Sequence, residues 1–252
     1  MKSLFTTVLL AGLACSFSLV AQEQPTVQLD LDNPLRTAEE KARDINRKPQ
    51  ETLSFFGLQP DMRVIELFPG QGWYTKLLAP LLADEGQLYL AIATDRVKDK
   101  LPEWGLNKVM ITGDVQGFTK TDLPGFIFSV DSIDLLQRDV DMVLTFRNAH
   151  NFTEQSREKL NAAVFAALKP GGIYGVIDHS RRHMEPLQEE RWRRVDPVQI
   201  IKEAVAAGFE FVDYSSLHAR PEDSLQFDTL HVSLPNESDR FTLKFRKPFN
   251  KN

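Results

Sequence analysis

The chain has 252 residues, of which 42% are hydrophobic and 26% are charged. This composition is ordinary for a packed soluble protein, and the length fits a single α/β domain. A formal net charge of −5 argues against a nucleic-acid-binding protein, because such a protein normally carries a basic face.

The first 21 residues predict a signal peptide. Lys2 precedes the apolar, acid-free stretch Leu4–Val20, and Leu19-Val20-Ala21 comes directly before Gln22. A basic start, an apolar core and a small-residue cleavage site are its three parts, and the core is shorter than the roughly 20 residues of a membrane span. We therefore expect a periplasmic or secreted protein that begins at Gln22 and has no membrane span after cleavage. A retained anchor and lipoprotein processing at Cys15 are the alternatives.

Cys15 is the only cysteine, so cleavage leaves no disulfide or thiolate site.

The rest of the chain alternates between helical and strand patterns. Residues 22–36 are polar, and we expect a loose arm there. The capping box Thr37-Ala38-Glu39-Glu40 starts one or two helices that are broken at Pro49. Residues 113–137 show neither a helical nor a strand periodicity of apolar residues, and we expect an insertion of uncertain shape there. Apolar runs predict six strands, and an alternating run predicts a late antiparallel one. The expected strands are Arg63–Phe68, Gln87–Ala93, Asn107–Thr112, Asp141–Phe146, Ile173–Ile177, Phe209–Ser215 and Phe241–Phe245.

The segment Val64–Leu82, VIELFPGQGWYTKLLAPLL, carries the clearest functional signal. It reads as a strand, a tight loop and a helix, and Pro69, Gly70 and Gly72 allow a ligand to approach the backbone closely. A loop after the carboxyl end of a strand in an open α/β sheet is where nucleotide-like ligands bind. Glu66, near that end, can accept hydrogen bonds from a ligand's cationic or hydroxyl groups. An ordinary turn that merely needs glycine is the alternative.

Glu66, Gly70 and Gly72 fit the pattern acid-x-Gly-x-Gly-x-Gly, with Phe68 in place of the first glycine. The segment therefore resembles the first motif of class I S-adenosylmethionine-dependent methyltransferases. Four blocks in order resemble a group of exported, predicted methyltransferases of that class: RDINRKP, PGQGWYTKLLAP, FRNAHNF and ESDRFTLKFRKP. The resemblance runs from about Thr37 to Pro248. It implies a single doubly wound, Rossmann-like methyltransferase domain over 37–252, with a mostly parallel seven-stranded sheet. It also implies S-adenosylmethionine as the cofactor.

The resemblance implies two further contacts with the cofactor. In the family, an acid that ends the second strand holds the ribose hydroxyls, because a carboxylate accepts two hydrogen bonds. The nearest acid here is Asp95, for which an N-cap of the next helix is an equal alternative. Asp114 matches the family's acid that meets the adenine amino group, with a turn residue as the alternative.

The predicted reactive face is built from polar residues after the fourth and fifth strands, since both loops leave the same sheet edge as the glycine turn. These residues are Arg147, Asn148, His150 and Asn151 after the fourth strand and Asp178 and His179 after the fifth. Methyl transfer is a displacement on a sulfonium, so the protein chiefly positions the nucleophile and removes its proton. His150 is the candidate base, Asn148 can orient an amine or hydroxyl, and His179 is a third catalytic candidate. A hydrogen-bonded structural role is the alternative for a lone histidine. His179 and His183 lie four residues apart without a third ligand in the sequence, so we expect no metal site.

The sequence thus predicts an exported S-adenosylmethionine-dependent methyltransferase that acts on a small molecule and binds no nucleic acid. The alternative is an exported binding or structural protein that kept the fold and lost catalysis. Three features favour that alternative: Phe68 in place of a glycine, the poor match of Asp95 to the family's ribose-binding acid, and the cytoplasmic origin of the cofactor. A third hypothesis is another small-molecule enzyme that uses His150 and His179. The sequence identifies neither the acceptor nor the oligomeric state.

Overall fold

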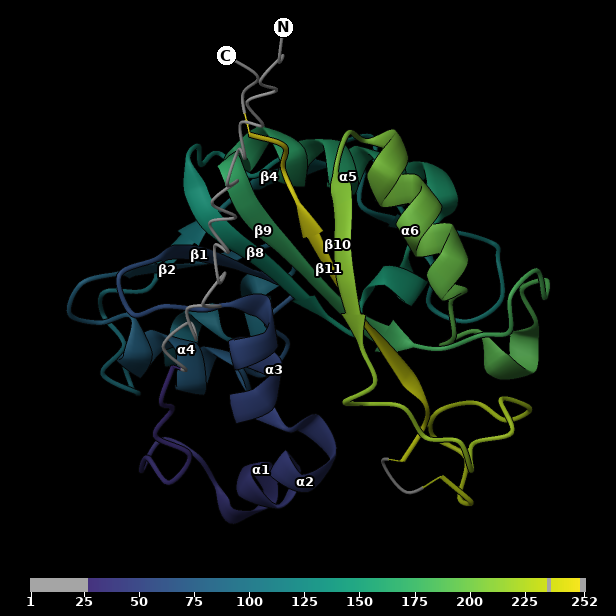
Figure 1. Cartoon of the computed structure of the whole chain (residues 1–252), viewed down its shortest axis with the longest axis horizontal. Helices are drawn as coiled ribbons and strands as arrows, with labels where there is room; N and C mark the ends of the chain where they lie inside the picture. Colours follow the sequence, from purple (N-terminus) through teal and green to yellow (C-terminus); the bar gives the residue numbers. More distant parts are fainter. Residues whose placement is uncertain (1–26, 235–236, 250–252) are drawn as a thin grey trace, which may run out of the picture.

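The structure is a computed structural model that describes residues 27–234 and 237–249. The predicted signal peptide lies outside the described residues. A seven-stranded sheet crosses the molecule in the order β10-β11-β9-β8-β1-β2-β3 (Figure 1). β11 is antiparallel to both neighbours, and the other pairs are parallel. The strands are β1 (Arg63–Leu67), β2 (Gln87–Ala91), β3 (Met110–Thr112), β8 (Val140–Phe146), β9 (Leu168–His179), β10 (Glu210–Ser215) and β11 (Arg240–Arg246). The predicted Rossmann-like methyltransferase fold with one late antiparallel strand is confirmed.

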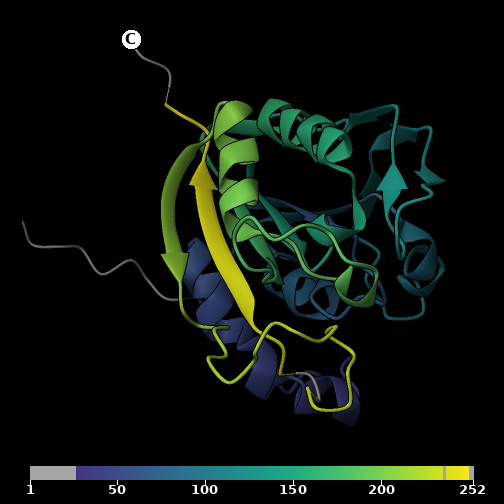
Figure 2. The ribbon, with the colours of Figure 1, turned by 90° about the vertical axis from the view of Figure 1, so that its right-hand side faces the viewer.

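Helices cover both faces of this sheet (Figures 1 and 2). Val64 packs with α3 (Pro49–Phe56) and α4 (Thr75–Leu81) on one face. Ile65 and Leu67 pack with α5 (Glu154–Ala167) and α6 (Pro197–Ala206) on the other face. Successive side chains of a strand point to opposite faces, so a strand buried on both sides reads as a continuous apolar run. This is why the inner strands were predictable from the sequence.

The start of β9 differs from the expectation. The fifth strand was expected over Ile173–Ile177. α5 ends at Ala167 and β9 already begins at Leu168, which has extended backbone angles, so Gly171 and Gly172 fall within the strand. Leu168 pairs with Val140, and the register between β8 and β9 shifts just after this pair. The glycines therefore lie in the irregular first part of a strand, where the Gly171 amide donates to the Lys247 carbonyl at 2.8 Å.

The predicted loose arm is packed against the domain over its described part, 27–36. Val27 and Leu29 are buried in the apolar cluster beside α3 and α4. The Gln50 side chain accepts a hydrogen bond from the Leu29 amide at 2.9 Å and donates one to the Val27 carbonyl. Two apolar side chains and one glutamine thus fix a segment whose overall polarity suggested mobility.

The capping box is confirmed. Thr37 Oγ1 accepts from the Glu40 amide at 3.3 Å, and Glu40 Oε2 accepts from the Thr37 amide at 2.9 Å. Three short helices follow instead of one or two: α1 (Ala38–Ala42), α2 (Asp44–Arg47) and α3, which begins at Pro49. Lys48 between α2 and α3 has a left-handed backbone with φ of 41°, and this sharp turn brings α1 and α2 back over the sheet edge.

The insertion at 113–137 forms two small two-stranded sheets. β4 (Asp114–Gln116) pairs with β7 (Ser132–Asp134), and β5 (Thr119–Lys120) pairs with β6 (Phe128–Ser129). Phe128 bridges to Phe152, which follows the short 3₁₀ helix η3 (Ala149–Asn151) after β8. The insertion therefore lies beside the loop that carries His150.

None of the helices within 27–234 and 237–249 is both long enough and apolar enough to cross a membrane.

Candidate active site

A cavity of about 530 Å³ lies between the carboxyl ends of β1 and β8 and the helices α1 and α2. Small-molecule sites in proteins usually have a volume of about 300–1,000 Å³. The predicted turn contributes Glu66, Pro69 and Gly70 to the wall, and the segment after β8 contributes Arg147 and Asn148. The structure thus brings together five sequence-predicted residues from two parts of the chain.

Glu66 is a buried acid in this wall. Its side chain is 2% exposed, and Thr75 Oγ1 donates a hydrogen bond to Oε2 at 2.7 Å. Burial raises the pKa of Glu66 to about 7, against the opposing effects of the Thr75 hydrogen bond and the positive Arg47. Because burial disfavours the charged carboxylate, a cationic group bound in the cavity would stabilise it.

The turn after Glu66 explains both its glycines and its departure from the family pattern. Gly70 has φ of 61°, and a side chain added there would meet nothing within 4 Å. Gly72 has φ of 82°, but an added Cβ would lie 2.9 Å from the Trp104 ring. Gly72 does not line the cavity, so this glycine serves the packing of Trp104. Phe68 adopts the left-handed backbone, φ of 53°, that suits glycine at its place in the pattern.

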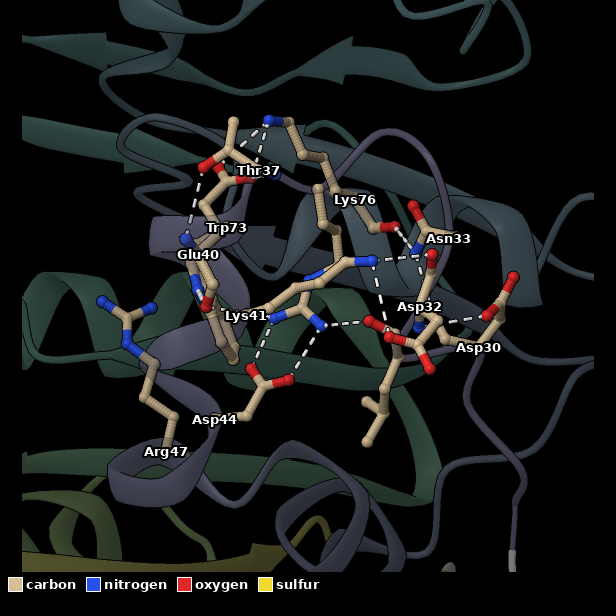
Figure 3. Close-up of polar contacts among 12 residues, drawn as sticks. Asp30, Asp32, Asn33, Thr37, Glu40, Lys41, Asp44, Arg47, Trp73 and Lys76 are labelled. Atoms are coloured by element: carbon tan, nitrogen blue, oxygen red, sulfur yellow. Dashed lines mark hydrogen bonds and ion pairs between the residues drawn. The ribbon is translucent and has the colours of Figure 1, made fainter.

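Trp73 anchors the helices α1 and α2 to the turn (Figure 3). Its Nε1 donates to the Glu40 carbonyl at 2.9 Å, and Lys76 Nζ lies 3.0 Å from the Glu40 carboxylate. The guanidinium of Arg47 lies 4.3 Å from the centre of the Trp73 ring, and that of Arg36 lies 5.0 Å from it. Sequence reasoning did not single out Trp73 or Arg47 as site residues, although Arg47 belongs to the RDINRKP block.

Positive charge gathers on one side of this cavity. Arg47 is buried, and Arg147 enters from the end of β8 with a left-handed backbone, φ of 62°. Burial, followed by the charge of Arg147, lowers the pKa of Arg47 to about 8. The ring of Tyr74 stacks on that of Phe146, with 3.6 Å between the ring centres. Burial raises the pKa of the Tyr74 phenol. Sequence reasoning did not single out Tyr74 either.

His150 and Asp178 form a buried pair. His150 Nδ1 lies 2.6 Å from Asp178 Oδ1, and the His150 amide donates to Oδ2 at 3.0 Å. Asp178 also accepts from the His179 amide at 2.7 Å. A carboxylate that binds Nδ1–H leaves Nε2 as the basic nitrogen, so His150 is oriented as a general base would be.

The three predicted catalytic residues line three neighbouring cavities. Asn148 lines the large cavity, His150 lines a second of about 290 Å³, and His179 lines a chamber of about 50 Å³. The rings of His150 and His179 are 5.7 Å apart. Phe68 in the first cavity packs on Phe152 in the second, with 5.0 Å between ring centres. These two rings lie at the boundary between the first and second cavities.

His179 is held as a neutral ring. Its Nδ1 lies 2.9 Å from Ser238 Oγ, and burial, with smaller effects from His150 and Arg147, holds its pKa well below 6.5. The structural alternative for this histidine thus has a specific partner in Ser238. His183 instead contacts Asp196 at 2.8 Å, and no group of three potential metal ligands occurs among the described residues.

Asp95 and Asp114 lie away from the large cavity. Asp95 is inside a 3₁₀ turn, Thr94–Arg96, where it pairs with Lys98 at 2.7 Å and does not cap a helix. Asp114 is exposed on β4 and accepts from Gln116 at 2.6 Å. The residues that line the cavity near this side are Lys100 and Trp104 instead. The two predicted nucleoside contacts stay predictions without support from this placement.

Neither a protein-family model nor a curated protein matches the chain. Solved structures do. An S-adenosylmethionine-dependent methyltransferase from Aquifex aeolicus is 16% identical to this chain, with a TM-score of 0.56. The alignment covers 86% of this chain and 95% of that methyltransferase. The 1,6-didemethyltoxoflavin-N1-methyltransferase from Burkholderia thailandensis, solved with S-adenosylhomocysteine, is 15% identical with a TM-score of 0.51, covering 81% and 78%. The chain has the fold of these methyltransferases.

A further similar structure limits what the fold implies. The [4+2]-cyclase SpnF is 19% identical with a TM-score of 0.55, and the alignment covers 87% of this chain and 86% of the cyclase. A methyltransferase and a cyclase thus share this architecture. At such identities the likeness establishes the fold, and the argument for a reaction has to come from the site.

Proposed function

We propose that the protein transfers a methyl group from S-adenosylmethionine to a small-molecule acceptor. The observation that carries this proposal is the large cavity at the end of β1, where Glu66 and the bare α-carbon of Gly70 face the same space as Arg47 and Arg147. The sheet topology supports it, because ligands of doubly wound folds bind outside the carboxyl ends of the strands.

The cavity residues fit the amino-acid end of this cofactor. That end carries an ammonium group and a carboxylate. Glu66 can accept hydrogen bonds from the ammonium, Arg47 can bind the carboxylate, and Gly70 leaves room for close approach to the backbone. Trp104 also lines this cavity and can contact the nucleoside end. When bound, S-adenosylmethionine supplies an electrophilic methyl group on a sulfonium.

The chain's own contribution to the reaction is positioning and proton removal. Asn148 lines the same cavity as Glu66, and its side-chain amide donates to the Phe146 carbonyl at 2.9 Å, which fixes its orientation. His150, oriented by Asp178, is the proposed base. Because His150 lines the second cavity, the acceptor's reacting group would approach from that side, next to Phe152.

We further propose that the protein acts outside the cytoplasm after cleavage before Gln22. The amino-terminal pattern of basic start, apolar core and small residues supports this. Amino-terminal sequencing of the protein recovered from the periplasmic fraction tests it, and an intact Leu4–Val20 segment in membranes would contradict it.

Calorimetric titration of the protein with S-adenosylmethionine and S-adenosylhomocysteine tests the proposed function. We expect Gly70→Val to weaken binding of both ligands by about tenfold or more, because the added side chain enters the cavity and each factor of ten is about 1.4 kcal/mol. Gly72→Val is not suited to this test, since it would displace Trp104.

Gly57→Val is the matched control. Gly57 also has a left-handed backbone, φ of 83°, and an added Cβ would meet only the flexible end of Lys244 at 3.7 Å. Both variants incur the left-handed strain of about 1–2 kcal/mol, but Gly57 lies outside the cavity wall. If the wild type binds neither ligand, or if Gly70→Val binds as tightly as Gly57→Val, the proposed cofactor site is wrong.

A further inference from the structure

Several arginines with buried or half-buried side chains fall into two groups. In the first group each guanidinium pairs with a carboxylate: Arg157 Nη2 lies 2.7 Å from Glu203 and Arg194 Nη2 lies 2.8 Å from Asp223. The second group is Arg43, Arg47 and Arg147. Within residues 27–234 and 237–249, the side chains of these three make no ion pair or hydrogen bond. Arg47 instead packs over Trp73.

The second group converges on one place. Arg43 and Arg47 come from the α1–α2 region and Arg147 follows β8, about 100 residues later, yet all three line both the large cavity and the 50 Å³ chamber beside it. Arg240, at the start of β11, lines the chamber as well. Its remaining described walls are Asn46, His179, Thr229, Leu230 and Ser238, which include no Asp or Glu.

The acids that line the large cavity with these arginines do not form ion pairs with them: Glu39 is exposed, and Glu40 pairs with Lys76. Asp178, whose charge acts on Arg147, already accepts hydrogen bonds from the ring of His150 and from two backbone amides. Glu66 has a pKa raised to about 7, so it carries only part of a negative charge at neutral pH. Guanidinium groups stay protonated in proteins, and even Arg47, whose pKa is lowered to about 8, is mostly charged at neutral pH. The cluster therefore has net positive charge in a partly buried place, which is unfavourable unless an anion binds there.

The backbone supports a binding role for Arg147. Its left-handed φ of 62° is uncommon for a residue other than glycine. Its amide donates to the Ile177 carbonyl, which holds the turn in place. Strained residues of this kind gather at ligand sites, where the surrounding structure fixes the side chain in position.

We propose that the methyl acceptor carries an oxyanion, a carboxylate or a phosphate group, and that Arg43 and Arg147 bind it in the chamber. This inference rests on the proposed function, because only that function makes the bound molecule the methyl acceptor. Guanidinium groups bind carboxylate and phosphate through paired, charge-assisted hydrogen bonds. A chamber of about 50 Å³ admits only such a head group. The remainder of the acceptor then extends into the large cavity, which shares Arg47 and Arg147 with the chamber.

Calorimetry with the protein saturated with S-adenosylhomocysteine tests this inference. The probes are inorganic phosphate and succinate, each titrated at constant ionic strength, with succinamide as the uncharged counterpart of succinate. We expect one oxyanion to bind without displacing S-adenosylhomocysteine, and succinamide not to bind. Phosphate binding without succinate binding identifies a phosphorylated acceptor, and the reverse identifies a carboxylic acid.

Arg147→Gln and Arg43→Gln should each weaken oxyanion binding by about tenfold or more, since each removes a charged hydrogen-bond donor. Arg138→Gln is the control, because Arg138 is an exposed arginine paired with Asp134 outside both cavities. Arg147→Lys keeps the charge without the paired geometry and should bind with intermediate affinity, which tests the site even if Arg147→Gln does not fold.

Three outcomes overturn the inference: neither oxyanion binds, both arginine variants bind like the wild type, or the oxyanion displaces S-adenosylhomocysteine. In the last case the arginines hold the carboxylate of the cofactor. A protein that fails to bind S-adenosylhomocysteine contradicts the proposed function instead. The same oxyanion titrations on the cofactor-free protein then still decide whether the arginine chamber binds an anion.

Discussion

Replacing Glu66 with glutamine should remove a pH dependence of stability. The folded protein holds the pKa of Glu66 at about 7, above the ordinary value of 4.5, because the carboxyl is buried. Between these two values the folded chain binds more protons than the unfolded chain, so the free energy of unfolding falls as the pH rises. The full difference corresponds to about 3 kcal/mol, at about 1.36 kcal/mol per pKa unit.

Urea unfolding of wild type and Glu66→Gln between about pH 5 and about pH 8 measures this effect. The variant, which is neutral throughout, should gain on the wild type as the pH rises, by up to about 3 kcal/mol. Glu85→Gln is the control, because Glu85 is exposed and its replacement should leave the pH profile unchanged. A difference between wild type and Glu66→Gln that stays constant with pH, or that shrinks as the pH rises, would refute the reasoning.

The same carboxyl links pH to the proposed cofactor. An ammonium group beside Glu66 favours the charged carboxylate, so S-adenosylmethionine should bind more tightly as the pH rises towards the pKa of Glu66. Glu66→Gln should bind more weakly and lose this pH dependence. Calorimetry in buffers of different ionisation enthalpy would detect the proton released on binding by the wild type alone.

Two further predictions concern Phe68 and His150. Phe68→Gly should be more stable than Phe68→Ala by about 1 kcal/mol in urea unfolding, because both lose the ring but only glycine relieves the left-handed backbone. Equal stability, or a more stable alanine variant, would show that this backbone is unstrained. Once an acceptor is found, His150→Ala should lower the methyl-transfer rate by about 10²–10⁴-fold. Its affinity for S-adenosylhomocysteine should not change, because His150 lies outside the large cavity; a wild-type rate would exclude His150 as the base.

The parts of the fold that depend on local chemistry were predictable. The apolar run that contains Val64, Ile65 and Leu67 indicates a strand that is buried on both faces. The Thr37 capping box is contained within four consecutive residues. The insertion at 113–137 was not predictable. Its two short strand pairs are held mainly by backbone hydrogen bonds between exposed or half-buried residues, so no apolar period marks them in the sequence.

The lining of the candidate cavity was predictable where its residues follow the strand ends, and not where they come from distant segments. Glu66, Gly70 and Asn148 line the cavity as expected because parallel strands end at one edge. Gly72 was assigned to the ligand for a correct local reason, its backbone freedom, but the indole of Trp104 takes the space. The meeting of Arg47 with Arg147 depends on how α1 and α2 fold back over the sheet, which no spacing in the sequence encodes.

Glu66 and Arg47 lie within electrostatic range of each other but do not form an ion pair among the described residues. Buried arginines such as Arg157 and Arg194 pair with acids, whereas Glu66 and Arg47 lie apart on the wall of one cavity. Unpaired opposite charges are unfavourable in the free protein and are complementary to a zwitterion, such as the amino-acid end of S-adenosylmethionine. The carboxylate of the cofactor can bind Arg47 and at most one neighbouring arginine. The positive charge of Arg147, which extends to the chamber beyond, is then left for a second anion, and this excess is what distinguishes an anionic acceptor from a neutral one.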